Sequence, residues 1–232
     1  MKKLLAIMLC LFLLAAFGAA ASAEETAVRE NAVTELYSAE GTYTDSIGNV
    51  ETYSFHVPQL HVDTPAAQEI NQEIAERFGS YVKEQIKNMA EGYSLWSWYT
   101  GWHAYWYGGE LFLLIEADLE GGFHDIAAFG YDFEKDCRVS NKAILQQLGI
   151  SEEKYMENLR EKTQLMFEDM YGSLPDKEAF GYDELLQKTM DWLDADQPMF
   201  IDGNGQIETI VKIASVAGAE WYYHLVTPFS YG

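Results

Sequence analysis

The chain has 232 residues, of which 15 are lysine or arginine and 37 are aspartate or glutamate, so its formal net charge is −22. Nucleic acids and anionic lipids are polyanions, and a protein surface of this charge repels them. The composition therefore excludes nucleic acid as an expected partner. It favours solubility, or the attraction of a basic protein.

The first 23 residues are typical of a secretory signal peptide. Lys2 and Lys3 precede an apolar stretch at residues 4–17, and Ala21-Ser22-Ala23 forms a small-residue cleavage site. The alternative is a retained anchor helix, because the apolar stretch approaches the ~20 residues of a membrane span. We expect cleavage after Ala23 and a mature chain without a membrane span. Its location is then extracytoplasmic, either secreted or at the cell surface.

The rest of the chain is expected to form a single domain. Residues 24–40 are polar without a clear period and predict a mobile leader, and residues 41–232 predict one α+β domain. Cys137 is the one cysteine after the signal peptide, so the mature chain has no internal disulfide and depends on its hydrophobic core. The role of Cys137 itself stays open.

Strand patterns at residues 42–44 and 49–62 surround a turn at residues 46–49 and predict a hairpin. A helix follows, because Thr64 is a typical N-cap and Pro65 suits the first helical position. Its buried stripe recurs every four residues: Ile70, Ile74, Phe78, Val82 and Ile86.

Three further strands are predicted at residues 93–107, 111–119 and 123–133. Glycine pairs separate them, which is typical of an antiparallel meander. Helices are expected from Asn141, from the N-cap Ser151 and from Tyr182, before strands at residues 198–202, 206–216 and 221–227. The predicted fold is α+β, an antiparallel sheet with one long and several shorter helices packed on it.

Short motifs spread over residues 50–228 carry a family resemblance. They are Tyr-Ser-Phe-His-Val-Pro-Gln-Leu at 53–60, Glu-Ile-Asn-Gln-Glu-Ile at 69–74, Gly-Gly-Phe-His at 121–124, Tyr-Asp-Phe at 131–133 with Ala-Ile-Leu at 143–145, and the hairpin that begins at 200–205. The chain resembles an extracytoplasmic domain family of unassigned function. That family occurs in lysozyme-sensing anti-sigma factors and N-terminal to secreted peptidoglycan deacetylase domains. The resemblance implies the fold and an envelope setting; it carries over neither the anti-sigma nor the deacetylase activity.

An unusual aromatic row lies in the first strand of the meander. Trp96, Trp98, Trp102 and Trp106 all occupy even positions, and period-two alternation places them on one face. An exposed row would form a platform for sugar rings or a protein interface. The alternative is that the row is the core face of the sheet, beneath the stripe of the predicted helix.

His124, next to Asp125, is a second candidate for ligand binding or acid–base chemistry. Adjacent strand residues point to opposite faces, which weakens the case for a His124–Asp125 pair. His61 and Asp63 have the spacing of a shared metal, although a structural role is favoured. Asp202-Gly203-Asn204-Gly205 imitates half a calcium loop but lacks the glutamate at the twelfth position, which favours a turn. We predict neither cofactor nor metal.

No catalytic motif is present. We therefore expect an exported, non-catalytic binding or sensing domain of the bacterial cell envelope. Its ligand would be a cell-wall glycan such as peptidoglycan, or a basic wall-active protein such as lysozyme. The alternative is a secreted cell-wall hydrolase with a carboxylate pair such as Asp194/Asp196 or Glu168/Asp169.

Overall fold

A computed structural model describes residues 31–45, 47–93, 98–119 and 123–229. The strands are β1 (Val33–Thr44), β2 (Val50–Leu60), β3 (Tyr99–Tyr107), β4 (Glu110–Leu119), β5 (Phe123–Asp132), β6 (Cys137–Arg138), β7 (Met199–Ile201), β8 (Ile207–Ala214) and β9 (Trp221–Val226). The helices are α2 (Pro65–Ile74), the π-helix η1 (Ala75–Gly79), α3 (Ser80–Glu91), α4 (Asn141–Gln147), α5 (Glu152–Tyr171) and α6 (Tyr182–Asp191). The signal peptide lies outside the described residues.

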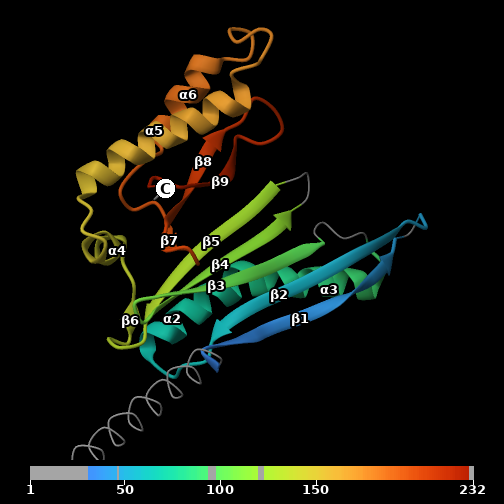
Figure 1. Ribbon diagram of the computed structural model, residues 1–232. Helices are drawn as coiled ribbons and strands as arrows, with labels where there is room; N and C mark the ends of the chain where they lie inside the picture. The colour runs from blue at the N-terminus through green and yellow to red at the C-terminus, as the bar shows by residue number, and fades with distance from the viewer. Residues whose placement is uncertain (1–30, 46, 94–97, 120–122, 230–232) are drawn as a thin grey trace, which may run out of the picture.

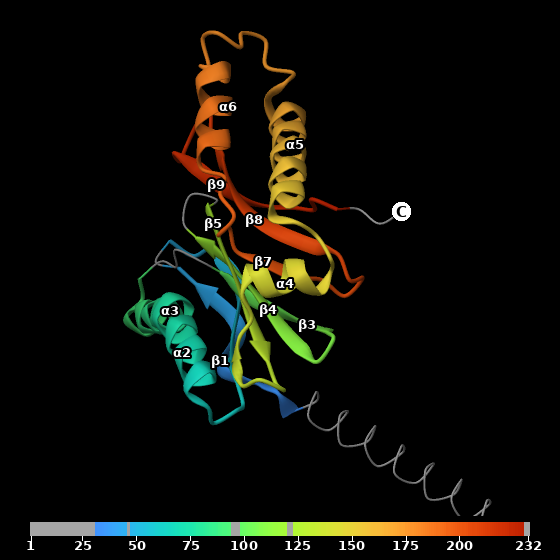
Figure 2. The same ribbon diagram turned by 90° about the vertical axis from the view of Figure 1, so that its left-hand side faces the viewer.

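The strands form two sheets, which lie in the middle of four layers (Figure 1). Sheet A has the order β1-β2-β3-β4-β5-β6, and sheet B has the order β7-β8-β9. Helices α2 and α3 cover one face of sheet A, whereas sheet B, with α5 and α6 beyond it, covers part of the other (Figure 2). The mixed α+β class is confirmed.

The prediction of a purely antiparallel sheet is wrong. Most neighbours in sheet A are antiparallel, but β2 and β3 run parallel, where Ser54 pairs with Tyr99 and Phe55 with Thr100. This pairing is possible because the helices α2 to α3 form the long crossover that parallel strands require. The last three strands form sheet B instead of extending sheet A.

The predicted mobile leader is also wrong for residues 33–40, because β1 begins at Val33. Its pairing with β2 starts at Val33 opposite Leu60 and continues to Thr44 opposite Val50. A bulge between Glu35 and Tyr37 interrupts the register, so the sequence here does not alternate as a strand should. Leu36 and Tyr37 pack against the core.

The predicted long helix after Thr64 is three consecutive helical segments rather than one regular helix. The Thr64 hydroxyl accepts a hydrogen bond from the backbone N–H of Ala67 at 3.3 Å, which confirms the N-cap. The π-helix η1 separates α2 from α3. Four members of the predicted stripe are at most 1% exposed: Ile70, Ile74, Phe78 and Val82. The fifth member, Ile86, is 38% exposed.

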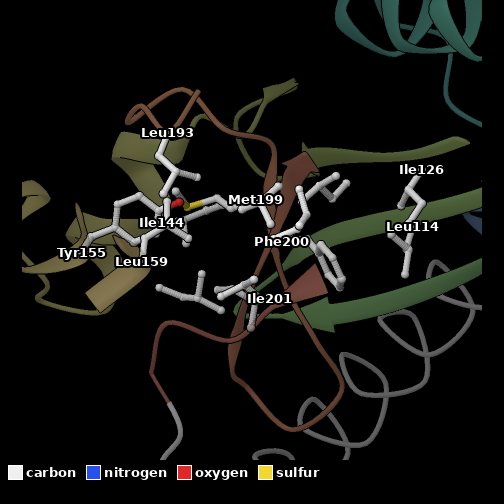
Figure 3. Packing of buried hydrophobic residues seen from close by; sticks show 14 of the residues in the cluster. Leu114, Ile126, Ile144, Tyr155, Leu159, Leu193, Met199, Phe200 and Ile201 are labelled. Carbon is white, nitrogen blue, oxygen red and sulfur yellow. The ribbon is translucent and has the colours of Figure 1, made fainter. Parts of the chain in front are cut away.

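Two hydrophobic cores hold the layers together. The helix-side core lies between sheet A and the helices α2 to α3, and Phe55, Ile70, Phe78 and Leu113 belong to it. The inter-sheet core joins sheet A, sheet B and the helices α4 to α6. Figure 3 shows Met199, Phe200 and Ile201 of β7 between Tyr155 and Leu159 of α5 and Leu114 and Ile126 of sheet A.

Other local predictions are confirmed. Ser151 caps α5, and its hydroxyl accepts a hydrogen bond from the backbone N–H of Lys154 at 3.2 Å. Asp202 to Gly205 form a turn between β7 and β8, closed by a hydrogen bond from the Gly205 N–H to the Asp202 carbonyl at 3.0 Å. None of the helices within the described ranges has the length and apolar character needed to cross a bilayer.

Candidate functional site

The candidate site is a surface on sheet A, on the face that sheet B only partly covers. We call it the tyrosine–carboxylate patch and define it by five residues: Tyr99, Tyr105, Glu116, Asp118 and His124. Their positions follow from strand register, because Glu116 lies opposite Gly101 and Asp118 lies opposite His124. Alternate residues share a face, so Tyr99 and Tyr105 lie on the same side of β3 as Glu116 and Asp118 do on β4.

His124 forms a cross-strand pair with Asp118. The distance from His124 Nδ1 to Asp118 Oδ1 is 2.8 Å, and the two side chains are 57% and 46% exposed. The sequence neighbour Asp125 has a different partner, since it points to the opposite face and binds the guanidinium of Arg77 from η1. His124 and Asp125 therefore have separate partners on opposite faces of the sheet, as the strand alternation predicts.

Two tyrosines lie within the field of the carboxylates. Burial, and then the negative charges of Glu116 and Asp118, raise the pKa of Tyr99, which is 37% exposed. Burial also raises the pKa of Tyr105, together with Asp202, Glu116 and Glu208. The Tyr105 ring stacks on Phe200 of β7 at 5.6 Å, which fixes it against sheet B.

A second histidine approaches the patch from sheet B. His224 of β9 is half-buried, and burial, followed by the nearby His124, lowers its pKa. Its Nε2 atom is buried without a hydrogen-bond partner among the described residues. Tyr223, the preceding residue, interacts with Arg77 and thereby links β9 to the helix layer.

The tryptophans of the predicted row lie in different environments. Trp96 lies outside the described residues, and Trp98 precedes β3 with 39% of its surface exposed. Trp102 and Trp106 lie on one face, as predicted, and both pack against the helix-side core. The Trp102 Nε1–H donates to Glu35 Oε1 at 3.1 Å, and the Trp106 ring lies 5.1 Å from that of Phe133. The position of Trp102 and Trp106 favours the core interpretation for these two indoles.

The remaining candidates are dispersed. His61 and Asp63 lie in the exposed connection between β2 and α2. Asp194 accepts a hydrogen bond from the backbone N–H of Asp196 at 2.9 Å, which is a local turn contact. Cys137 is a free, half-buried thiol in β6. Within the part of the chain that the structure describes, no three histidine, cysteine or acidic side chains are grouped so that they could hold a metal ion.

The sequence did not single out four members of the patch: Tyr99, Tyr105, Glu116 and Asp118. A signal was present, because β4 is apolar from Leu111 to Ile115 and then carries acids at two alternate positions. Alternate acids at the end of a buried strand indicate that one face of the sheet becomes exposed there.

No protein-family model matches the chain, and no curated protein matches it either. The resemblance to the extracytoplasmic domain family therefore stays a prediction. The site has to be interpreted from its own chemistry.

The patch is suited to binding. It presents the exposed Tyr99 beside the carboxylates of Glu116 and Asp118, and this combination attracts cationic side chains by charge and by contact with the ring face. Acid–base catalysis by His124 and Asp118 would need a substrate held within hydrogen-bond reach in a site that excludes water. Both side chains are about half-exposed.

Proposed function

We propose that the chain is an exported, non-catalytic binding domain of the bacterial cell envelope, and that its ligand is a basic wall-active protein such as lysozyme. The tyrosine–carboxylate patch is the observation that carries this proposal. The net charge of −22 supports it, because a negative field attracts a cationic partner over a long distance and raises its association rate. The signal peptide and the family resemblance support the envelope setting.

The test is the association rate of the mature chain, residues 24–232, with lysozyme over a range of ionic strength. We expect the rate constant to fall steeply with added salt, because salt screens the charges that steer the encounter. Glu116→Lys should lower the rate at low salt by about tenfold or more, since it reverses a charge inside the patch.

The matched control is Glu161→Lys on the exposed surface of α5, which changes the net charge by the same amount. We expect it to lower the rate by less than about twofold. Equal effects of the two variants, or a rate that does not depend on salt, would overturn the proposal.

A cell-wall glycan is the second candidate, and the exposure of adjacent aromatic residues favours it. Trp98 and Tyr99 are 39% and 37% exposed, and aromatic faces stack on sugar rings. Soluble peptidoglycan fragments should then shift the tryptophan fluorescence in a saturable way, and Trp98→Ala should abolish the shift. Turnover of labelled peptidoglycan would instead support the hydrolase alternative.

A further inference from the structure

A cleft of about 610 Å³ runs along the outer edge of β5. One wall comes from α2 and η1, and the other comes from Asn141 and the start of β7. The lining residues are Glu73, Glu76 and Arg77, then Ala127 to Gly130 of β5, then Arg138, Val139, Asn141, Pro198 and Met199. None of these residues belongs to the tyrosine–carboxylate patch.

The floor of this cleft is an incompletely paired strand edge. Among the described residues, β6 pairs with β5 only at Tyr131 and Asp132, and the Gly130 carbonyl accepts one more hydrogen bond from the N–H of Val139 at 2.9 Å. Four residues earlier, the Ile126 carbonyl accepts a hydrogen bond from Arg77 Nη2 at 3.0 Å. Both carbonyls therefore point away from β4, towards the outer edge.

Ala128 lies between these two bonds. Alternate residues of a strand direct their backbone groups to the same edge, so the N–H and C=O of Ala128 also point into the cleft. An edge that presents such groups is a template for one more strand. Ala128 is only partly buried, and the cleft beside it is the space that an added strand would occupy.

The charge of the lining indicates the kind of occupant. Two glutamates and two arginines line the cleft, so their charges balance, whereas the whole chain carries −22. Arg138 is already paired with Glu73 at 2.8 Å, and Arg77 is paired with Asp125. A balanced groove on an acidic molecule offers no net attraction to a polycation or a polyanion, and it leaves backbone hydrogen bonds as the main source of affinity.

We propose that this cleft binds a short, uncharged, extended segment of a partner protein, which adds to β5 as a strand next to β6. The added strand exchanges hydrogen bonds with Ala128. Its side chains alternate between the wall formed by Glu73 and Arg138 and the wall formed by Pro198 and Met199.

The experiment selects peptides from a phage-displayed library of random linear octapeptides on the mature chain. We expect enriched peptides to be uncharged and to alternate β-branched with small residues. Ala128→Pro removes the N–H that points into the cleft and should weaken their binding by at least about tenfold. The matched control Ala128→Ser keeps the N–H and should bind within about threefold of the original protein.

A second measurement on the unchanged protein keeps the proposal testable if Ala128→Pro does not fold. A selected peptide should slow amide hydrogen exchange at Ala128 by at least about tenfold, because the amide becomes hydrogen-bonded. The same peptide with N-methylated backbone amides should have no such effect, since it cannot pair with a strand edge.

Three outcomes would overturn the proposal. The first is a library that yields no enriched peptide, or only charged ones. The second is a set of selected peptides that bind Ala128→Pro as well as Ala128→Ser. The third is sedimentation of the chain as a dimer and of Ala128→Pro as a monomer, because a second copy then occupies the edge.

Discussion

At the scale of the residue, Glu110 is a carboxyl group in an unfavourable place. It is 6% exposed, and its Oε2 atom has no hydrogen-bond partner among the described residues. Asp132 lies opposite Glu110 in the pairing of β4 with β5, and Asp132 forms an ion pair with Lys135. Burial first, and then the charge of Asp132, raise the pKa of Glu110 above its usual value of 4.5.

The raised pKa predicts how stability depends on pH. Unfolded Glu110 loses its proton near pH 4.5, whereas the folded group holds it to higher pH, so the free energy of unfolding falls as the pH rises through this window. Glu110→Gln removes this fall in the free energy of unfolding, because the glutamine side chain carries no titrating proton. We expect the variant to be more stable than the original protein at pH 7 by about 1 kcal/mol, and the difference to shrink as the pH falls to 4.

Urea denaturation across this pH range measures the effect. Glu161→Gln, which changes an exposed carboxyl on α5, is the control and should show no such trend. A Glu110→Gln variant that is less stable than the original protein at pH 7, or a difference that is constant with pH, would contradict the account.

The residue scale is also where the sequence is least informative about the site. His124 was recognisable as a candidate, but its partner Asp118 lies on the neighbouring strand, and the pair depends on the register of β4 with β5. The division of the tryptophan row depends on the helix layer that covers Trp102 and Trp106. A single-strand pattern contains neither piece of information.

At the scale of the element, the π-helix η1 explains how an apolar stripe with a constant spacing of four residues stays buried. Four residues of an α-helix turn through about 400°, so each step of the stripe drifts by about 40°. From Ile70 to Val82 the stripe takes three such steps and would drift by about 120°. The wider π turn at Ala75–Gly79 absorbs one residue and returns Phe78 and Val82 to the buried face.

Because the π turn only absorbs one extra residue, we expect that residue to be dispensable. Deletion of Glu76, which is exposed, changes the stripe spacing from four-four-four to four-three-four, the pattern of a regular amphipathic helix. We expect the free energy of unfolding of the deletion variant to stay within about 1 kcal/mol of the original value, because the same side chains remain buried. Loss of the π turn should be visible in a crystal structure.

Insertion of one alanine after Glu76 is the opposite change at the same place. It makes the middle spacing five and turns Phe78 and Val82 towards solvent, which should cost more than about 3 kcal/mol. Chemical denaturation compares the two variants. If the deletion costs as much as the insertion, the period of the stripe is not the cause of the π turn.

Elements set by local signals were predictable, and elements set by pairing were not. Thr64 and Ser151 cap helices with their own side chains, so nearby residues suffice to locate both starts. The start of β1 at Val33 depends on its pairing with Leu60 and lies across a bulge that breaks the alternation. The parallel pairing of β2 with β3 joins residues separated by the whole helix layer.

At the scale of the whole molecule, the inter-sheet core makes one unit of two sheets. Phe112 and Leu114 of sheet A and Phe200 and Ile210 of sheet B all belong to it. β8 is largely buried on both faces, with apolar residues at 207, 210, 211, 213 and 214. This pattern would suit either a further strand of sheet A or a separate sheet. The sequence alone therefore predicts the strands of sheet B but not the sheet in which they lie.

Phe200 tests whether the two sheets unfold together. Its side chain is 1% exposed and stacks on Tyr105 of β3. Phe200→Ala leaves a cavity between the sheets, and we expect it to lower the free energy of unfolding by about 3–5 kcal/mol. Phe180→Ala is the matched control, because Phe180 is 44% exposed, and it should cost less than about 0.5 kcal/mol.

Urea denaturation followed by tryptophan fluorescence and by far-ultraviolet circular dichroism should give one coincident transition for all three proteins, since the inter-sheet core couples both sheets. Two separate transitions in the original protein would mean that sheet A with its helices folds without sheet B, and Phe200→Ala would then shift only one of them.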